Sequence, residues 1–292
     1  MFNPLSTKDS AIQIALKLEG EDLWNLCSTN KRLLKWICNN KQFWDQKIPR
    51  DFGINPREMF GRAGSSEDYR FLYNTKDIDR SILGIMLTEE SRRGNIDHAK
   101  LLLRNGANIH EQKDYAMRLA AKNGHLNVVD LLLVNGADVH AEDGEAFRWA
   151  ARNGHKDVVD FLLKNGANIH AEDEGALRWA SENGHNDVVE LLLENGADVH
   201  IYRDSALRLA AYGGHADVVE TLIKNGADIR VDDDEVLIIA AENGHIDVVE
   251  LLLKSGSNIH ARDDEALLVA AENDHNDVTE ILLKYGENPA VL

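Results

Sequence analysis

Apolar residues return at a fixed interval along most of this 292-residue chain. Segment 126–135 carries four of them at helical spacing: Val128, Val129, Leu132 and Leu133. This pattern predicts an amphipathic helix with one buried face. The preceding segment 115–123 predicts a second helix, in which Ala120 and Ala121 are small enough to let a neighbouring helix approach closely. Both segments recur every 30 residues, and seven such units can be counted.

Glycine marks the end of each predicted helix. Asn-Gly follows the second helix of five units, at 105–106, 135–136, 165–166, 195–196 and 225–226. Gly-His follows the first helix of five units, at 124–125, 154–155, 184–185, 214–215 and 244–245. Glycine suits the left-handed residue that closes a helix, where a side chain costs about 1 kcal/mol. We expect the histidines to cap turns and to bond to neighbouring backbone.

One pair of helices cannot bury its apolar stripe alone, whereas stacked copies bury it against one another. The repeat therefore predicts an all-α solenoid of seven helix-turn-helix units over residues 79–292. The segment "AFRWAARNGHKDVVDFLLKNGANIHAED", residues 146–173, resembles ankyrin repeats in its paired alanines, Gly-His, Val-Val/Leu-Leu helix and Gly-Ala-Asn. The usual ankyrin period is about 33 residues, so we expect the missing residues to come from the β-turn tip.

The usual Thr-Pro-Leu-His at the start of the first ankyrin helix is also absent. An acid precedes an arginine by three or four positions in four units, at Asp114, Glu145, Glu174 and Asp204. We interpret this acid as a helix N-terminal group that also forms a local pair with the arginine, in place of the missing hydrogen bonds.

Residues 1–53 do not repeat and predict a small helical domain, followed by a Gly-, Pro- and Ser-containing linker over 54–78. One interpretation is a cap that closes the open end of the stack. The segment "LEGEDLWNLCSTNKRLLKWICNNKQFW", residues 18–44, is also similar to the second half of an F-box, without the F-box opening Leu-Pro. The resemblance implies that a Skp-type adaptor of a cullin ubiquitin ligase binds at Leu18, Leu23, Leu26 and Trp44.

An F-box-like segment followed by 30-residue ankyrin units resembles proteins encoded by giant DNA viruses that infect amoebae. This resemblance implies a client protein from the host and a location in the host cytoplasm. The two cysteines, Cys27 and Cys38, are too few for a disulfide framework, which fits a reducing, intracellular compartment. No apolar run reaches the length of about 18 residues that a membrane span needs.

The charge of the chain is strongly uneven. The net charge is −18, yet residues 1–80 hold 13 basic and 11 acidic residues, whereas the remainder holds 19 and 39. An acidic solenoid repels phosphate backbones, so we expect no nucleic-acid partner. We also expect no metal or other cofactor, because equivalent histidines of stacked units stand about 8–10 Å apart, too far to share one zinc ion.

No phosphate-binding loop or nucleophile motif appears in the sequence, so we expect a binding protein and not an enzyme. The residues that vary between units are then the candidates for client binding on the inner, concave surface that the resemblance implies. They are Leu119, Trp149, Trp179, Leu209, Lys122, Arg152, Tyr212 and Tyr202. Tryptophan is favoured in binding hot spots; the alternative is that the indoles only pack over the neighbouring unit.

Two functions follow. The first is an adaptor whose solenoid selects a client and whose F-box-like part couples that client to a ubiquitin ligase. The alternative is a scaffold or competitor that binds a host protein without recruiting a ligase.

Overall fold

The computed structural model describes residue 47 and residues 80–287. The chain divides into two compact units, Met1–Glu111 and Gln112–Leu292. The predicted F-box-like domain, with Leu18, Leu23, Leu26 and Trp44, and the linker 54–78 lie outside the described residues, apart from residue 47.

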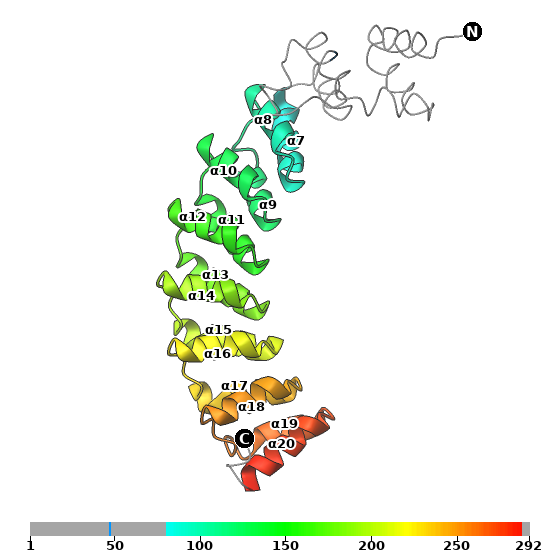
Figure 1. Ribbon diagram of the computed structural model, residues 1–292, viewed down its shortest axis with the longest axis vertical. Coiled ribbons are helices and arrows are strands. Elements are labelled where there is room, and N and C mark those ends of the chain that lie inside the picture. The colour runs from blue at the N-terminus through cyan, green and yellow to red at the C-terminus, as the bar shows by residue number, and fades with distance from the viewer. Residues whose placement is uncertain (1–46, 48–79, 288–292) are drawn as a thin grey trace, which may run out of the picture. The chain divides into compact units, whose positions relative to one another are not determined.

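Helices account for the secondary structure of residues 80–287, which contain no strand (Figure 1). In the first unit α7 spans Arg80–Arg92 and α8 spans Ile96–Arg104. In the second unit the helices are α9 (Tyr115–Lys122), α10 (Leu126–Val134), α11 (Ala141–Arg152), α12 (Lys156–Lys164), α13 (Ala171–Glu182), α14 (Asn186–Glu194), α15 (Ile201–Gly213), α16 (Ala216–Lys224), α17 (Val231–Glu242), α18 (Ile246–Lys254), α19 (Glu265–Glu272) and α20 (Asn276–Glu287). The predicted all-α class and the predicted helical pairs are confirmed.

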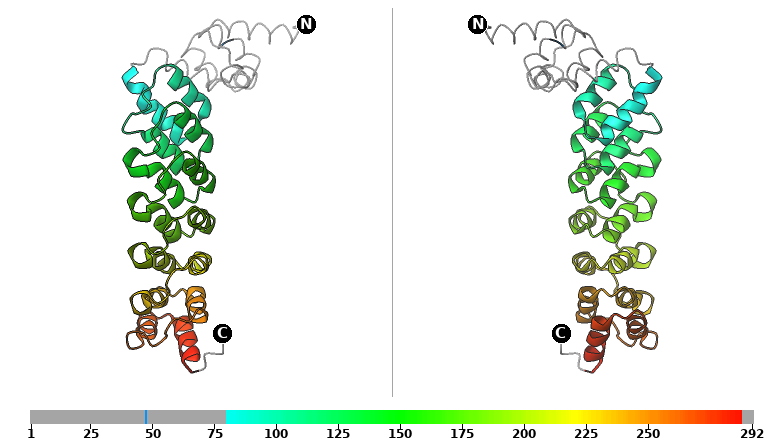
Figure 2. Two further views of the ribbon diagram at one scale, coloured as in Figure 1. Left: turned by 90° about the vertical axis from the view of Figure 1, so that its left-hand side faces the viewer. Right: turned by 90° about the vertical axis from the view of Figure 1, so that its right-hand side faces the viewer.

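The helices of the second unit form two columns (Figure 2). Odd-numbered helices contact one another in chain order, even-numbered helices do the same, and each odd helix contacts the even helix that follows it. The contact is more extensive between odd helices, since they meet through fully buried alanines such as Ala150 and Ala180. Between the columns lie residues such as Val158, Val159 and Leu162, also fully buried, each of which stabilises the fold by about 1.5–3 kcal/mol.

Three consecutive residues with positive φ precede α9 and α19, and the same turn lies near the start of α11, α13, α15 and α17. In α11 these are Glu142, Asp143 and Gly144, with φ of 51°, 54° and 72°. The tight left-handed turn connects one repeat to the next where a longer ankyrin β-turn is absent. It is costly for residues other than glycine, at about 1–2 kcal/mol each.

Arginine side chains stabilise these left-handed turns. Arg118 donates hydrogen bonds to the carbonyl oxygens of Lys113 (3.1 Å) and Gln112 (2.7 Å). Arg148 does the same to Asp143 (3.3 Å) and Glu142 (3.0 Å). Charge-assisted hydrogen bonds are stronger than neutral ones, so the guanidinium offsets part of the backbone strain.

The predicted local pair between an acid and the arginine of the same unit is wrong. Glu145 forms an ion pair with Arg118 of the preceding repeat, and the buried Asp114 makes no side-chain capping bond to its own helix. Instead its carboxylate accepts from the backbone N–H of Asp138, 3.3 Å away in the loop that follows α10. The left-handed turn presents carbonyl oxygens to the arginine, so the acid is available to join neighbouring repeats.

The Gly-His pairs also join successive repeats. Nε2 of His185 donates to the carbonyl oxygen of Arg152 at 3.0 Å, and the same bond recurs at His155, His215, His245 and His275. The expected histidine–backbone contact is confirmed. A Cβ added to Gly154 would lie 2.6 Å from Nδ1 of His185, so this glycine is needed for close approach as well as for its φ of 73°.

We predict that two chemically identical substitutions differ in cost. Gly154→Ala and Gly166→Ala both place a side chain at positive φ, but nothing lies within 4 Å of a Cβ on Gly166. Gly166→Ala should lower the free energy of unfolding by about 1 kcal/mol, and Gly154→Ala by about 1–3 kcal/mol more. Urea denaturation of the full chain measures both. Equal losses would contradict the steric role of His185, and His185→Ala should remove the excess.

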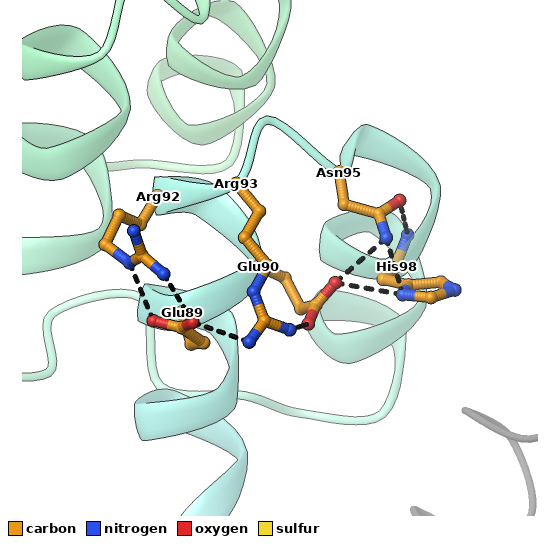
Figure 3. A network of polar contacts seen from close by, with 6 residues as sticks. All are labelled: Glu89, Glu90, Arg92, Arg93, Asn95 and His98. Carbon is orange, nitrogen blue, oxygen red and sulfur yellow. Dashed lines mark hydrogen bonds and ion pairs between the residues drawn. The ribbon is translucent and has the colours of Figure 1, made fainter. Parts of the chain in front are cut away.

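A buried polar network joins α7 to α8 in the first unit (Figure 3). Glu90 and His98 are 6% and 8% exposed. Oε2 of Glu90 accepts hydrogen bonds from Nδ1 of His98 and Nδ2 of Asn95, each 2.9 Å away. Burial raises the pKa of Glu90, but hydrogen bonding from His98, the charges of His98 and Arg93 and the Asn95 bond lower it overall.

The neighbouring Glu89 provides a matched control, because it makes exposed ion pairs with Arg92 and Arg93. Glu90→Ala should cost about 3–5 kcal/mol of folding free energy, because it removes the carboxylate that pairs with the buried His98, whereas Glu89→Ala should cost less than about 1 kcal/mol. A lowered folded-state pKa means that the Glu90 contribution is present above its ordinary pKa of 4.5 and is lost as pH falls further. Urea denaturation of the unmodified protein and both variants at pH 7 and pH 3 measures the free energies of unfolding. Equal losses of this free energy for Glu90→Ala and Glu89→Ala at pH 7 would contradict the prediction.

Candidate interaction surface

The eight side chains predicted to bind a client all lie on odd-numbered helices, whose exposed surface is hereafter called the odd-helix face. The predicted client-binding residues come from α9, α11, α13 and α15. Leu119, Trp149, Trp179 and Leu209 are half-buried, whereas Lys122, Arg152, Tyr202 and Tyr212 are exposed. Neither tryptophan is sealed inside the solenoid.

Each tryptophan packs beneath a cation of the preceding repeat. Nζ of Lys122 lies 4.9 Å from the centre of a Trp149 ring. The guanidinium carbons of Arg148 and Arg152 lie 5.2 and 5.6 Å from the centre of a Trp179 ring. These cation–π contacts support the interpretation that the indoles pack over the neighbouring unit, and they hold the rings in a fixed orientation at the surface.

Tyr202 extends this alternation of cation and ring into α15. The guanidinium carbon of Arg178 lies 5.3 Å from the centre of its ring. Its hydroxyl donates to the Asp173 carboxylate, and that bond, together with the charge of Asp173, raises the pKa of Tyr202.

A shallow hollow adjoins Tyr202 on the same face. Its volume is about 460 Å³, and its lining combines aromatic, aliphatic and charged side chains: Arg178, Tyr202, Ser205, Arg208, Leu209, Tyr212, Glu235 and Ile239. Three of the predicted client-binding residues are therefore brought together here, and the two tryptophans lie on the helices before it. Such a mixture of rings and cations is typical of the anchors that dominate protein–protein interfaces.

The chain matches the family model for ankyrin repeats (three copies) in five overlapping stretches, at residues 86–173, 117–203, 149–233, 177–263 and 207–291. The chain belongs to the ankyrin-repeat family. The crystal structure of the human ASB11 ankyrin repeat domain is similar, with a TM-score of 0.60 and 26% sequence identity. The match covers 68% of this chain and 96% of that chain. No curated protein matches the chain.

Ankyrin repeats generally mediate protein–protein interaction, which is consistent with the varied odd-helix face. In the described residues no helix is long and apolar enough to cross a membrane. Within the same residues no group of three or more His, Cys, Asp or Glu side chains is placed to hold a metal ion.

Sequence reasoning missed that an arginine at the first helix of one repeat can form an ion pair with the residue 27 positions later, in the following repeat. Glu145 forms an ion pair with Arg118, and Glu235 lies 2.9 Å from Nη1 of Arg208. At the same position of the intervening repeats stand Gly175 and Ser205. The sequence carries the signal, but it becomes visible only when arginines are aligned with the following repeat instead of their own.

We predict that Lys122 and Trp149 are energetically coupled through their packing contact. Lys122→Met and Trp149→Leu, made singly and together, should show a coupling free energy of about 0.5–1 kcal/mol, because the pair is partly exposed. Thermal or urea denaturation of the four proteins gives this value. A control cycle that pairs Lys122→Met with Leu209→Ala, on a distant helix, should show none; equal coupling in both cycles would contradict the contact.

Proposed function

We propose that the chain is a non-catalytic interaction protein that holds a client protein on its odd-helix face. The observation that carries this proposal is that Trp149, Trp179 and Tyr202 each lie beneath a cation, while Tyr202 and Tyr212 line a hollow on the same face. Ordered rings lose little conformational entropy on binding, so a preformed aromatic surface favours association. The rest of the solenoid serves as the rigid frame for these side chains.

We further propose that the F-box-like segment recruits a Skp-type adaptor through Leu18, Leu23, Leu26 and Trp44, and so couples the client to a cullin ubiquitin ligase. The sequence resemblance over residues 18–44 supports this half of the proposal. A host client in the cytoplasm, with no cofactor, fits the resemblance to proteins of giant viruses.

A second candidate function is a scaffold or competitor that binds the client without a ligase. One observation favours it: the F-box opening Leu-Pro is missing, and Ser6-Thr7 stands near its place. In that case residues 1–53 serve as a cap for the stack.

The client surface is tested with Trp149→Ala combined with Trp179→Ala in the full-length protein. Affinity capture from host lysate with mass spectrometry should lose the client, because the two rings supply the central contact area. Phe161→Ala is the control, since this half-buried aromatic residue lies on α12, in the even column. Undiminished capture by the tryptophan variant, or equal loss with Phe161→Ala, would remove the odd-helix face from the proposal.

The adaptor half is tested separately with a purified Skp-type adaptor and the full-length protein. Leu23→Ala combined with Trp44→Ala should abolish co-purification, because both side chains belong to the proposed adaptor contact. The tryptophan variant above serves as the control and should retain the adaptor. Absence of any complex with the unmodified protein would favour the scaffold function.

A further inference from the structure

The repeats provide an internal comparison of four equivalent arginines on the odd-helix face. Arg118 and Arg208 each bind a carboxylate from the following repeat, through Nη1. Arg148 and Arg178 hold the same position in α11 and α13, but the residues that follow them by 27 positions, Gly175 and Ser205, have no carboxylate. Among the described residues neither arginine forms an ion pair.

The two open arginines are otherwise held in place. Arg148 donates to two backbone carbonyls through Nε and Nη2 and lies over Trp179. Arg178 donates to the carbonyl of Glu172 through Nη2 at 3.3 Å and lies over Tyr202. Nε of Arg178 and Oγ of Ser205 are buried without a hydrogen-bond partner among the described residues. Both of these residues line the hollow.

The acidic side chains nearest in sequence are already engaged in part. Glu142 pairs with Lys113, Glu145 with Arg118 and the buried Glu174 with His170, while Asp173 accepts from Tyr202. Glu182 occupies on α13 the position that Lys122 and Arg152 hold on α9 and α11, and so marks the boundary of the basic region. Between α9 and α15 the odd-helix face therefore presents four cations without an ion pair among the described residues, in a chain of net charge −18: Lys122, Arg148, Arg152 and Arg178.

We propose that Arg148 and Arg178 bind two carboxylate side chains of an acidic segment of the client. The carboxylates take the positions that Glu145 and Glu235 hold in the flanking repeats, and an apolar side chain of the same segment enters the hollow beside Tyr202. Stacked helices stand about 8–10 Å apart. Three residues of a polyproline II chain span about 9 Å and bring side chains i and i+3 to the same face. The segment is therefore in a polyproline II conformation, with acidic residues three positions apart. This inference rests on the proposed client-binding function and names the chemistry of its ligand.

The test restores the missing carboxylate. Ser205→Glu supplies Arg178 with the internal partner that Arg208 already has, so it should preserve the thermal stability of the protein while blocking the ligand. Asn127→Glu is the control, because it adds the same charge at an exposed position of α10, in the even column. Glu235→Ser combined with Asp232→Asn has the opposite purpose: it removes both carboxylates that pair with Nη1 of Arg208 and should strengthen binding.

The probe is a 12-residue peptide selected from a random display library on the full-length protein, and its Glu/Asp→Gln/Asn counterpart. We expect acidic residues three apart in the selected peptides, weaker binding at high salt, and an affinity about tenfold lower for Ser205→Glu, in line with one lost charge-assisted bond. Asn127→Glu should bind as the unmodified protein does.

Three results overturn the inference. Selected peptides without acidic residues, or peptides that bind Ser205→Glu and the unmodified protein equally, exclude carboxylate recognition at Arg178. If the peptides that exclude carboxylate recognition still bind the Trp149→Ala, Trp179→Ala variant more weakly than the unmodified protein, the proposed client surface stands. Only the inferred acidic character of the ligand is then wrong. Selection of no peptide also overturns the inference, and client capture then decides the proposed function independently.

Discussion

The structure depends on the contact between one helical pair and the next. A single pair has an apolar stripe that it cannot cover, so its helices are stable only when the neighbouring pairs bury that stripe. Val158, Val159 and Leu162 are fully buried in this way. Histidine bonds and glycine clearance set the separation between pairs: His185 reaches back to the carbonyl of Arg152 across the space that Gly154 leaves open. Each further repeat reproduces the same fit.

The 30-residue period has a direct effect on the surface. Three left-handed residues stand at or just before the start of each odd helix from α9 to α19, and in four of these turns a carbonyl oxygen accepts from the arginine of the helical turns that follow. Three of these guanidinium groups, those of Arg118, Arg148 and Arg178, lie over aromatic rings of their own or the next repeat. A residue that stabilises the backbone of one repeat therefore also orders a ring on the odd-helix face. Single side chains thus combine a structural role with the proposed role in recognition.

Variation along the stack changes the chemistry of this face without changing the fold. The arginine row ends at Ile238, where α17 presents an aliphatic side chain instead. The cross-repeat acid is present at Glu145, absent at Gly175 and Ser205, and present again at Glu235. Because the acid lies at the rim of the inter-repeat contact, its loss leaves a cation accessible and the hydrophobic core intact. Ligand preference can thus be changed repeat by repeat.

The amino-acid sequence by itself determined the repeat, the two helices of each unit, the buried valines and leucines, and the histidine contact, because these follow from periodicity and from the special backbone angles of glycine. It also placed the candidate client-binding residues on the first helix of each unit, or just before it. Only the tertiary structure decided the partners of the arginines. Sequence proximity suggested an acid in the same helix, but the left-handed turn offers its carbonyl oxygens to the guanidinium, and the carboxylate comes from a residue 27 positions away where there is one. Such pairings depend on how two repeats are juxtaposed, which no local pattern encodes, and they determine which arginines of the odd-helix face keep an open nitrogen.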